Sequence, residues 1–284
     1  MDNELRPGKY RHFKGKEYEL ICTATHSETM ELMVVYRALY GEFGVWVRPL
    51  SMWNELVEVS GKKVPRFTYI GGEETWSNAL NDLWHRGTEN DWLTALAHYD
   101  DICRNAELDR EMETISCDTV ANMTADEFYS FLHDRYFVWK YTAKNRLATS
   151  RKQLEKYRTQ NDLFALERIK AALFSGDRKD SGIMLKTASQ IHGLGIAGAS
   201  GLLSILFPED YGTVDQFVIL ALCQILGFTW HDAVSAMKPG AITLHDGVML
   251  EDILRGKAAD LNKCFKTDFW TPRKIDKILW AFGR

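Results

Sequence analysis

The sequence predicts an α+β protein with two parts: a small N-terminal β-barrel-like domain over residues 1–72 and an all-α domain over residues 73–284. Two patterns carry this prediction. Short β-rich segments separated by glycine-containing turns fill the first part, whereas apolar residues recur at helical spacing beyond it. With 284 residues, 45% of them hydrophobic, the chain is long enough to bury two cores.

The first part contains four segments with the composition of β-strands, at residues 18–24, 32–40, 44–50 and 66–70. Turn signals separate them at residues 14–16, 41–44 and 60–63. Alternation in the second segment places two sets of side chains on opposite faces, Tyr36, Ala38 and Tyr40 against Val35, Arg37 and Leu39. The pair Gly71-Gly72 then predicts the junction between the two parts.

The second part predicts helices throughout. Its first helix is marked by apolar residues at helical spacing, namely Trp76, Ala79, Leu80, Leu83 and Trp84. Thr124 and Glu127 form a capping-box pattern, and Pro272 after Thr271 marks the start of the last helix. Further helices are expected near residues 142–157, 161–174, 181–191, 197–206, 216–226 and 247–264.

Charge is distributed unevenly along the chain. The net charge is +1 over residues 1–72, −11 over 73–128 and +6 over 129–284, for a total of −4. A nucleic-acid surface is therefore expected in the last block, which forms the core of the all-α domain. The acidic block is either a solvated helical face or a surface that docks on the basic block and limits access to DNA.

The sequence indicates neither a membrane segment nor a metal centre. No run approaches the roughly 18 apolar residues that span a bilayer, and the N-terminus lacks the apolar core of a secretory signal. We therefore expect a cytoplasmic protein with no membrane contact. The five cysteines include no C-x-x-C pair, so free thiols are expected rather than zinc or a redox pair.

A tight turn between two helices is the most informative local pattern. Gly193-Leu194-Gly195 ends one helix, and a helix rich in small residues begins directly after it. Glycine permits positive φ and close approach of the backbone, and the free N–H groups at the start of the next helix suit a phosphate. On this pattern alone, an ordinary helix–helix turn is the alternative interpretation.

The residues after the turn extend the pattern. Asp215 opens a further helix eighteen residues after Ala197, and a last helix closes the chain over residues 271–284. Together these features resemble the helix-hairpin-helix DNA glycosylase superfamily, the HhH-GPD fold, over about residues 125–284. The resemblance implies a glycosylase-like domain acting on double-stranded DNA, with backbone contacts from Gly193, Gly195 and Ala197.

The resemblance also implies that Asp215 is the catalytic carboxylate. Cleavage of an N-glycosidic bond builds positive charge on the sugar, which a nearby carboxylate stabilises, and the target base must first be flipped out of the duplex. Bifunctional members carry a lysine where this chain has Ala197, so no lyase step is expected. No cofactor and no iron–sulfur cluster are expected, because four closely spaced cysteines are lacking. The alternative role of Asp215 is to cap its helix.

A basic stretch over residues 140–158 supports the DNA interpretation. Its candidate phosphate contacts are Lys140, Lys144, Arg146, Arg151 and Lys152. A solvated helix face is the alternative. Two aromatic residues beside this stretch, Tyr136 and Trp139, are candidates for stacking on a base, although aromatic residues more often belong to the core.

The first part resembles a small bacterial domain-of-unknown-function family over residues 10–70. The resemblance rests on the strings YRHFKG, VVYRALYG and VWVRPL, and it implies no activity. The residues themselves suggest a ligand site formed by His26, Arg37, Trp46 and Arg48, because arginine grips phosphate or carboxylate and tryptophan stacks on planar ligands. The alternative is that these residues are surface features of a small barrel.

Two functions of different class follow from the sequence. The first is a monofunctional DNA N-glycosylase, a hydrolase without lyase activity, that excises a damaged or modified base. The second is a catalytically silent DNA-binding protein of the same fold. A third hypothesis is a nucleotide or small-ligand module centred on the first domain. Double-stranded DNA is the one partner that the sequence predicts.

Overall fold

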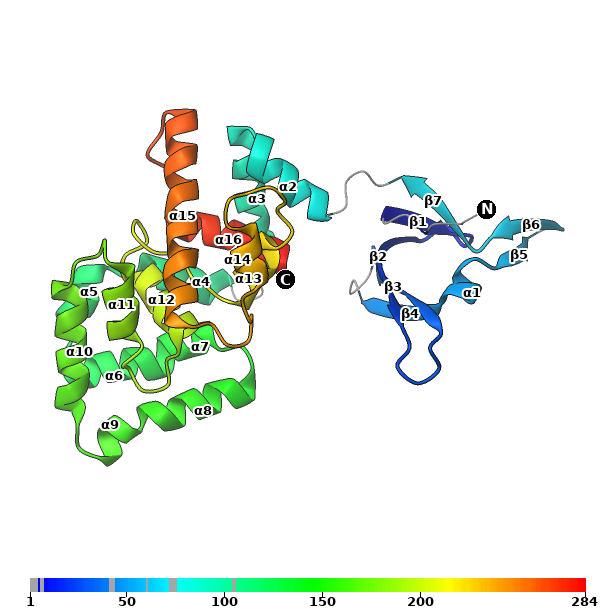
Figure 1. Ribbon diagram of the computed structural model, residues 1–284. Coiled ribbons are helices and arrows are strands. Elements are labelled where there is room, and N and C mark those ends of the chain that lie inside the picture. Colours follow the sequence, from blue (N-terminus) through cyan, green and yellow to red (C-terminus); the bar gives the residue numbers. More distant parts are fainter. Residues whose placement is uncertain (1–4, 6–7, 41–43, 60, 72–75, 104–105) are drawn as a thin grey trace. The chain divides into compact units, whose positions relative to one another are not determined.

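The computed structural model describes all residues except 1–4, 6–7, 41–43, 60, 72–75 and 104–105 (Figure 1). The chain divides into two compact units, residues 1–82 and 83–284. An antiparallel β part followed by a helical part confirms the predicted layout. Helix α2, Trp76–Arg86, spans the division. The predicted junction at Gly72 lies outside the described residues, as do parts of the predicted turns at 41–44 and 60–63.

The first unit is built on a five-stranded antiparallel sheet in the order β4-β3-β2-β1-β7. Its strands are β1 Gly8–His12, β2 Glu17–Thr25, β3 Leu32–Ala38, β4 Val45–Pro49 and β7 Phe67–Gly71. The sequence predicted β2, β3, β4 and β7 but missed β1. It also missed the short helix α1, Leu50–Trp53, and the hairpin of β5, Leu56–Val59, and β6, Lys62–Pro65. Among the described strands, β4 and β7 are the outer ones, so the sheet is open there and the expected barrel is not closed.

Aromatic residues form the core of the first unit. Trp53 of α1 stacks on Phe67 of β7 with ring centroids 3.8 Å apart, and Tyr10 and Tyr36 pack against Trp53 edge to face. Tyr36 and its same-face neighbour Ala38 are buried, which confirms the predicted alternation of β3 at these positions. The sheet therefore has one aromatic, core-forming face, here called the Tyr36 face.

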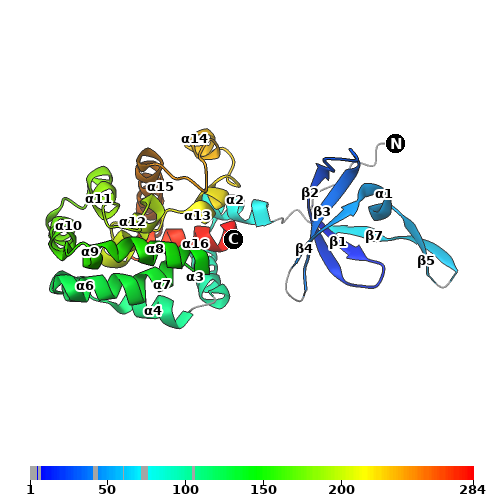
Figure 2. The same ribbon diagram turned by 90° about the horizontal axis from the view of Figure 1, so that it is seen from below.

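The second unit is all-helical, as predicted (Figures 1 and 2). Its longer helices are α3 Glu89–Ile102, α4 Ala106–Thr114, α8 Lys144–Leu154, α10 Leu163–Ser175, α11 Ser181–Ala188, α12 Ile196–Leu206, α15 Leu244–Phe265 and α16 Pro272–Gly283. Shorter ones are α5 Cys117–Ala121, α6 Ala125–Phe131, α7 Phe137–Lys140, α9 Lys156–Thr159, α13 Gln216–Leu222 and α14 His231–Ser235. None of the helices that the structure describes is long and apolar enough to cross a membrane.

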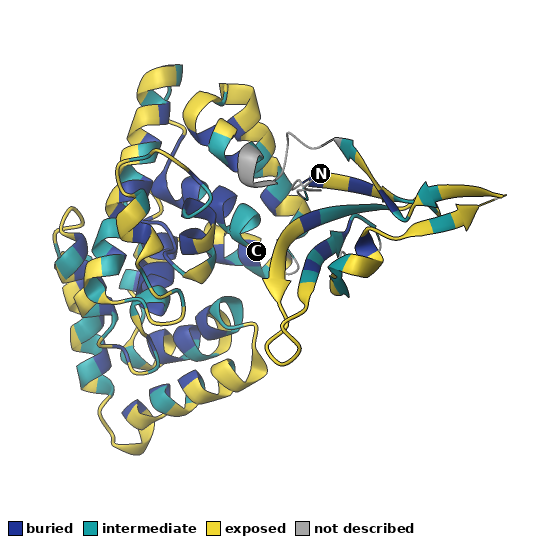
Figure 3. Cartoon of the chain, turned by 45° about the vertical axis from the view of Figure 1, so that its right-hand side comes forward, coloured by how far each residue is buried: buried dark blue, intermediate teal, exposed yellow. Residues whose placement is uncertain are grey.

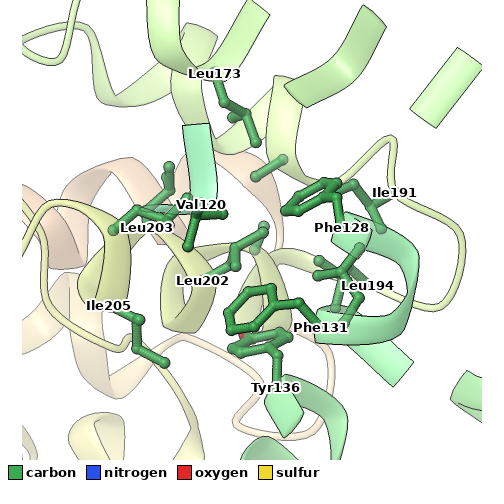
Figure 4. Packing of buried hydrophobic residues seen from close by; sticks show 14 of the residues in the cluster. Val120, Phe128, Phe131, Tyr136, Leu173, Ile191, Leu194, Leu202, Leu203 and Ile205 are labelled. Carbon is green, nitrogen blue, oxygen red and sulfur yellow. The ribbon is translucent and has the colours of Figure 1, made fainter. Parts of the chain in front are cut away.

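Helix α12 lies inside this unit, where nine of its eleven residues are buried. Figure 3 shows buried positions gathered on the inward sides of the helices. Figure 4 shows Leu202 near Phe131 and Leu203 beside Val120, within one cluster of buried residues. The small residues of α12 permit this packing: a Cβ atom on Gly198 would lie 2.6 Å from the Tyr141 hydroxyl.

Local signals set several helix boundaries. The predicted capping box at Thr124 and Glu127 is present at the start of α6, and Thr271 caps α16 with Pro272 in its first turn. The helix predicted over residues 142–157 is divided at Glu155 into α8 and α9. Between α6 and α7 the chain forms a π-helical turn, Leu132–Tyr136, which no sequence signal announced.

Part of the acidic block is built into the helical core. On α4, Asp109 is buried, and it lies 3.4 Å from the guanidinium of Arg273 on α16. Glu113 on the same helix is paired with Arg273 and with Lys277. These acids therefore neutralise cations of the last helix, so the block is more than a solvated face.

Candidate active site

The predicted hairpin joins α11 to α12 and packs against α8. Gly193 has a φ of +94°, and a Cβ atom there would lie 2.5 Å from the carbonyl oxygen of Ser150. Only glycine meets both conditions. Gly195 is the N-cap of α12 and is exposed, with no side chain capping the helix. The start of α12, including Ala197, therefore presents uncapped backbone N–H groups that suit an anion.

The segment that leads to Asp215 is buried and held by side chains. The N–H of Gly212 donates to Glu251 over 3.0 Å, the N–H of Thr213 donates to Asp276, and the N–H of Val214 donates to Ser200 over 3.0 Å. Three consecutive amides are thus satisfied by buried side chains, which fixes the backbone immediately before the carboxylate.

Asp215 caps α13, as one interpretation of the sequence predicted. Its Oδ1 accepts from the N–H of Phe217 over 3.0 Å. Its Oδ2 accepts from Nζ of Lys140 over 3.3 Å. The side chain is 17% exposed, so the carboxylate is oriented by two partners and still reaches solvent.

Lys140 reaches Asp215 across α12. It is the last residue of α7, its side chain is only 9% exposed, and a Cβ atom on Gly201 would lie 3.2 Å from its Cδ. Glycine at this position of α12 therefore leaves the path of the lysine stem open. The sequence grouped Lys140 with surface phosphate contacts, whereas the structure places it beside the candidate catalytic carboxylate.

A cavity of about 320 Å³ lies over this pair. Aromatic side chains provide much of its lining, including Tyr99, Trp139, Phe217 and Trp280. Trp139 is fixed by a hydrogen bond of 2.8 Å from Nε1 to Asp109. Tyr136, the other candidate for base stacking, is fully buried and donates to the carbonyl of Gly198, so it belongs to the core.

A buried ionic network closes one side of the cavity. The guanidinium of Arg273 lies 2.9 Å from the Asp276 carboxylate. Burial raises the pKa of Asp276 from 3.8 to about 6, and the positive charge of Arg273 opposes that rise. Burial also raises the pKa of Glu251 well above its usual value. The carboxyl groups that hold the backbone before Asp215 are thus kept out of water.

Helix α12 links the hairpin to the segment that carries Asp215. Ser200 lies about one helical turn, on the order of 5 Å, beyond Ala197, and its hydroxyl is bonded to both backbone groups of Val214. The uncapped start of α12 and Asp215 are consequently held by a single rigid helix.

Exposed cations lie on α8, the helix against which the hairpin packs. Lys144, Arg146 and Lys152 are exposed, as a surface that binds phosphates requires. Arg151 differs, because its Nε donates to the carbonyl of His133 over 3.0 Å and its guanidinium lies 3.8 Å from Asp134.

The ligand site predicted in the first unit is not assembled as expected. The register pairs Val34 with Arg48 and Arg37 with Val45, so Arg48 lies on the Tyr36 face and Arg37 on the opposite one. His26 lies at the β2–β3 turn, where its Nδ1 accepts from the amide of Thr29 over 3.2 Å. Only Trp46 and Arg48 share a face.

Several residues of the site were missed by sequence reasoning. The pairing of Lys140 with Asp215 joins positions 75 apart, and Asp276 holds Thr213 across 63 positions. The one local signal that could have pointed to this pairing is the run of small residues in α12, because small side chains let another group approach a helix closely.

Comparison with known proteins identifies the first unit. Residues 8–69 match the family model described as "Protein of unknown function (DUF1653)", so this part of the chain is a DUF1653 domain, which confirms the predicted family. The chain is also similar to the crystal structure of a DUF1653 protein from Bordetella bronchiseptica, at 41% identity over 25% of this chain and 94% of that chain, with a TM-score of 0.24. No curated protein matches the chain. The resemblance of the helical unit to the HhH-GPD fold has no matching family model and stays a prediction.

Proposed function

We propose that the helical unit is a monofunctional DNA N-glycosylase that removes a damaged or modified base. The observation that carries the proposal is the joint placement of Asp215 at an aromatic-lined cavity and of an uncapped helix start at the hairpin. In this proposal the hairpin binds one backbone phosphate and the exposed cations of α8 bind the adjacent phosphates. The cavity holds a base flipped out of the duplex.

The chemistry follows from the residues in the cavity. As the glycosidic bond breaks, positive charge develops on the sugar, and the Asp215 carboxylate stabilises it and orients the attacking water. Lys140 positions that carboxylate through Oδ2, and the cap on Phe217 N–H positions it through Oδ1. Ala197 occupies the position where bifunctional members of the resembled superfamily carry their lysine, which favours hydrolysis without a lyase step.

The test is base release from a panel of modified and damaged duplex DNAs, scored as alkali-revealed strand breaks. Asp215→Asn should release the base about 10²–10³-fold more slowly than the wild type, the usual effect of removing one group that stabilises developing charge. Glu209→Gln, which changes an exposed acid of the same segment, should cleave like the wild type. Equal cleavage by Asp215→Asn and wild type would refute the assignment.

A second candidate function rests on a specific observation. Both carboxylate oxygens of Asp215 already have partners, as a purely structural cap would. In that case the unit binds DNA without cleaving it. Salt-sensitive binding that survives Asp215→Asn, with no abasic product from any substrate, would favour this second function.

A further inference from the structure

The first unit carries a group of cationic side chains beside its aromatic core. The guanidinium carbon of Arg48 lies 5.7 Å from the centre of the Phe67 ring, and the His12 ring lies 4.9 Å from the same ring. Arg66 and Lys14 flank them, both over Phe13. These residues come from separate strands and turns that the sheet brings together.

The charges of this group are incompletely balanced. Arg66 is paired with Glu55 through two hydrogen bonds of 3.0 and 2.7 Å, whereas Arg48 makes no ion pair with any residue that the structure describes. Burial lowers the pKa of His12, and the positive charges of Arg66, Arg48 and Lys14 lower it further. This part of the surface is therefore electropositive, and the half-buried guanidinium of Arg48 has N–H donors available for an anion.

His12 adds a directed donor. Its Nδ1 accepts from the amide of Lys14 over 3.3 Å, so the neutral ring carries its hydrogen on Nε2. Trp46 adds a planar surface. It lies on the same face as Arg48, two positions away along β4, or about 7 Å, and it is 59% exposed. A guanidinium, an imidazole donor and an exposed indole on one face match a phosphate joined to a planar ring.

We propose that the DUF1653 domain binds a nucleoside monophosphate on its Tyr36 face, with the phosphate held by Arg48 and His12 and the base stacked on Trp46. The site lies wholly within the first unit and does not depend on the function proposed for the helical unit. Arg37 has no part in it, because its side chain projects from the other face of the sheet.

The experiment follows the ring signals of His12 by NMR in the full chain during titration with inorganic phosphate and with 2′-deoxyadenosine 5′-monophosphate. Both probes should give saturable shifts, because the bound phosphate would accept a hydrogen bond from the Nε2–H of His12 and change the surroundings of the ring. Arg48→Gln should lower the affinity for both probes at least tenfold. Trp46→Ala should lower the affinity for the nucleotide but leave the affinity for inorganic phosphate unchanged.

Arg37→Gln is the matched control, since it removes the same charge from the opposite face of the same sheet. It should change both affinities less than twofold. The absence of saturable shifts, or an equal loss in Arg37→Gln and Arg48→Gln, would overturn the proposal. If Arg48→Gln disturbs the ring signals of Trp53 and Phe67, Arg48→Lys replaces it. Weaker binding of both probes in that variant supports the site, because a lysine lacks the planar fork of donors that grips a phosphate, and unchanged binding of both probes opposes it.

Discussion

Substituting the two hairpin glycines separates the fold of the hairpin from its function. Gly193→Ala forces alanine into a φ of +94°, at a cost of about 1–2 kcal/mol. It also places Cβ 2.5 Å from the Ser150 carbonyl oxygen, and such overpacking costs about 1–3 kcal/mol. The helical unit should therefore lose roughly 2–5 kcal/mol of unfolding free energy, which lowers its Tm by about 5–15 °C.

Gly195→Ala is the matched substitution two positions later. Its φ is −94°, and a Cβ atom there meets nothing within 4 Å, so stability should change by less than about 0.5 kcal/mol. The added methyl group lies at the uncapped start of α12, where the phosphate is proposed to bind. We expect duplex DNA affinity to fall about tenfold, the equivalent of one lost hydrogen bond.

Thermal unfolding followed by circular dichroism measures the first effect, and fluorescence anisotropy with labelled duplex DNA at fixed salt measures the second. A Gly193→Ala protein that melts with the wild type would refute the packing argument. A Gly195→Ala protein that binds DNA like the wild type would refute the phosphate contact, whatever its stability.

Three further predictions follow from the same contacts. Gly201→Ala places Cβ 2.8 Å from the Tyr136 hydroxyl and 3.2 Å from Lys140 Cδ. It should slow base release about tenfold or more in single-turnover kinetics, because a small displacement of the groups at an active site lowers the rate steeply. The raised pKa of Asp276 favours the folded state below about pH 4, and this contribution of at most about 3 kcal/mol is lost as pH rises through about 6. Urea unfolding between pH 4 and pH 7 should show that loss in wild type and not in Asp276→Asn. Trp53→Ala should cost about 3–5 kcal/mol in the first unit and leave the melting of the helical unit unchanged, as calorimetry can show.

For each of these three predictions, one result would contradict the reasoning. Unchanged single-turnover rates in Gly201→Ala would mean that the lysine stem is not held by α12. Parallel pH profiles for wild type and Asp276→Asn would mean that this carboxyl does not titrate with folding. A common shift of both melting transitions in Trp53→Ala would mean that the units unfold together.

Local patterns predicted most of the fold. Strand alternation identified β3 and the side on which Tyr36 is buried, and caps at Thr124 and Thr271 located two helix starts. The strand β1 was missed because its five residues, Gly8–His12, alternate between buried and exposed over too short a span to register as a pattern. Its pairing with β2 and β7 is a long-range property.

The candidate site was only partly predictable for the same reason. Gly193 and Asp215 belong to a spacing that is visible in the chain, whereas the partners of Asp215 depend on which helices pack together. Lys140 carries the same charge as its exposed neighbour Lys144, and from the sequence both are predicted to contact phosphate. What distinguishes Lys140 is its burial against Gly201, which only the packed structure shows.

The π-helical turn at Leu132–Tyr136 bears on how such a site arises. A π turn holds one residue more than a regular turn, and each residue rotates a helix by about 100°. Trp139 and Lys140, which follow it, therefore lie about one residue position, or roughly 100°, from where an uninterrupted α-helix of the same sequence would place them. The side of the helix on which the amine meets the cavity thus depends on how many residues the turn contains as much as on which residues they are.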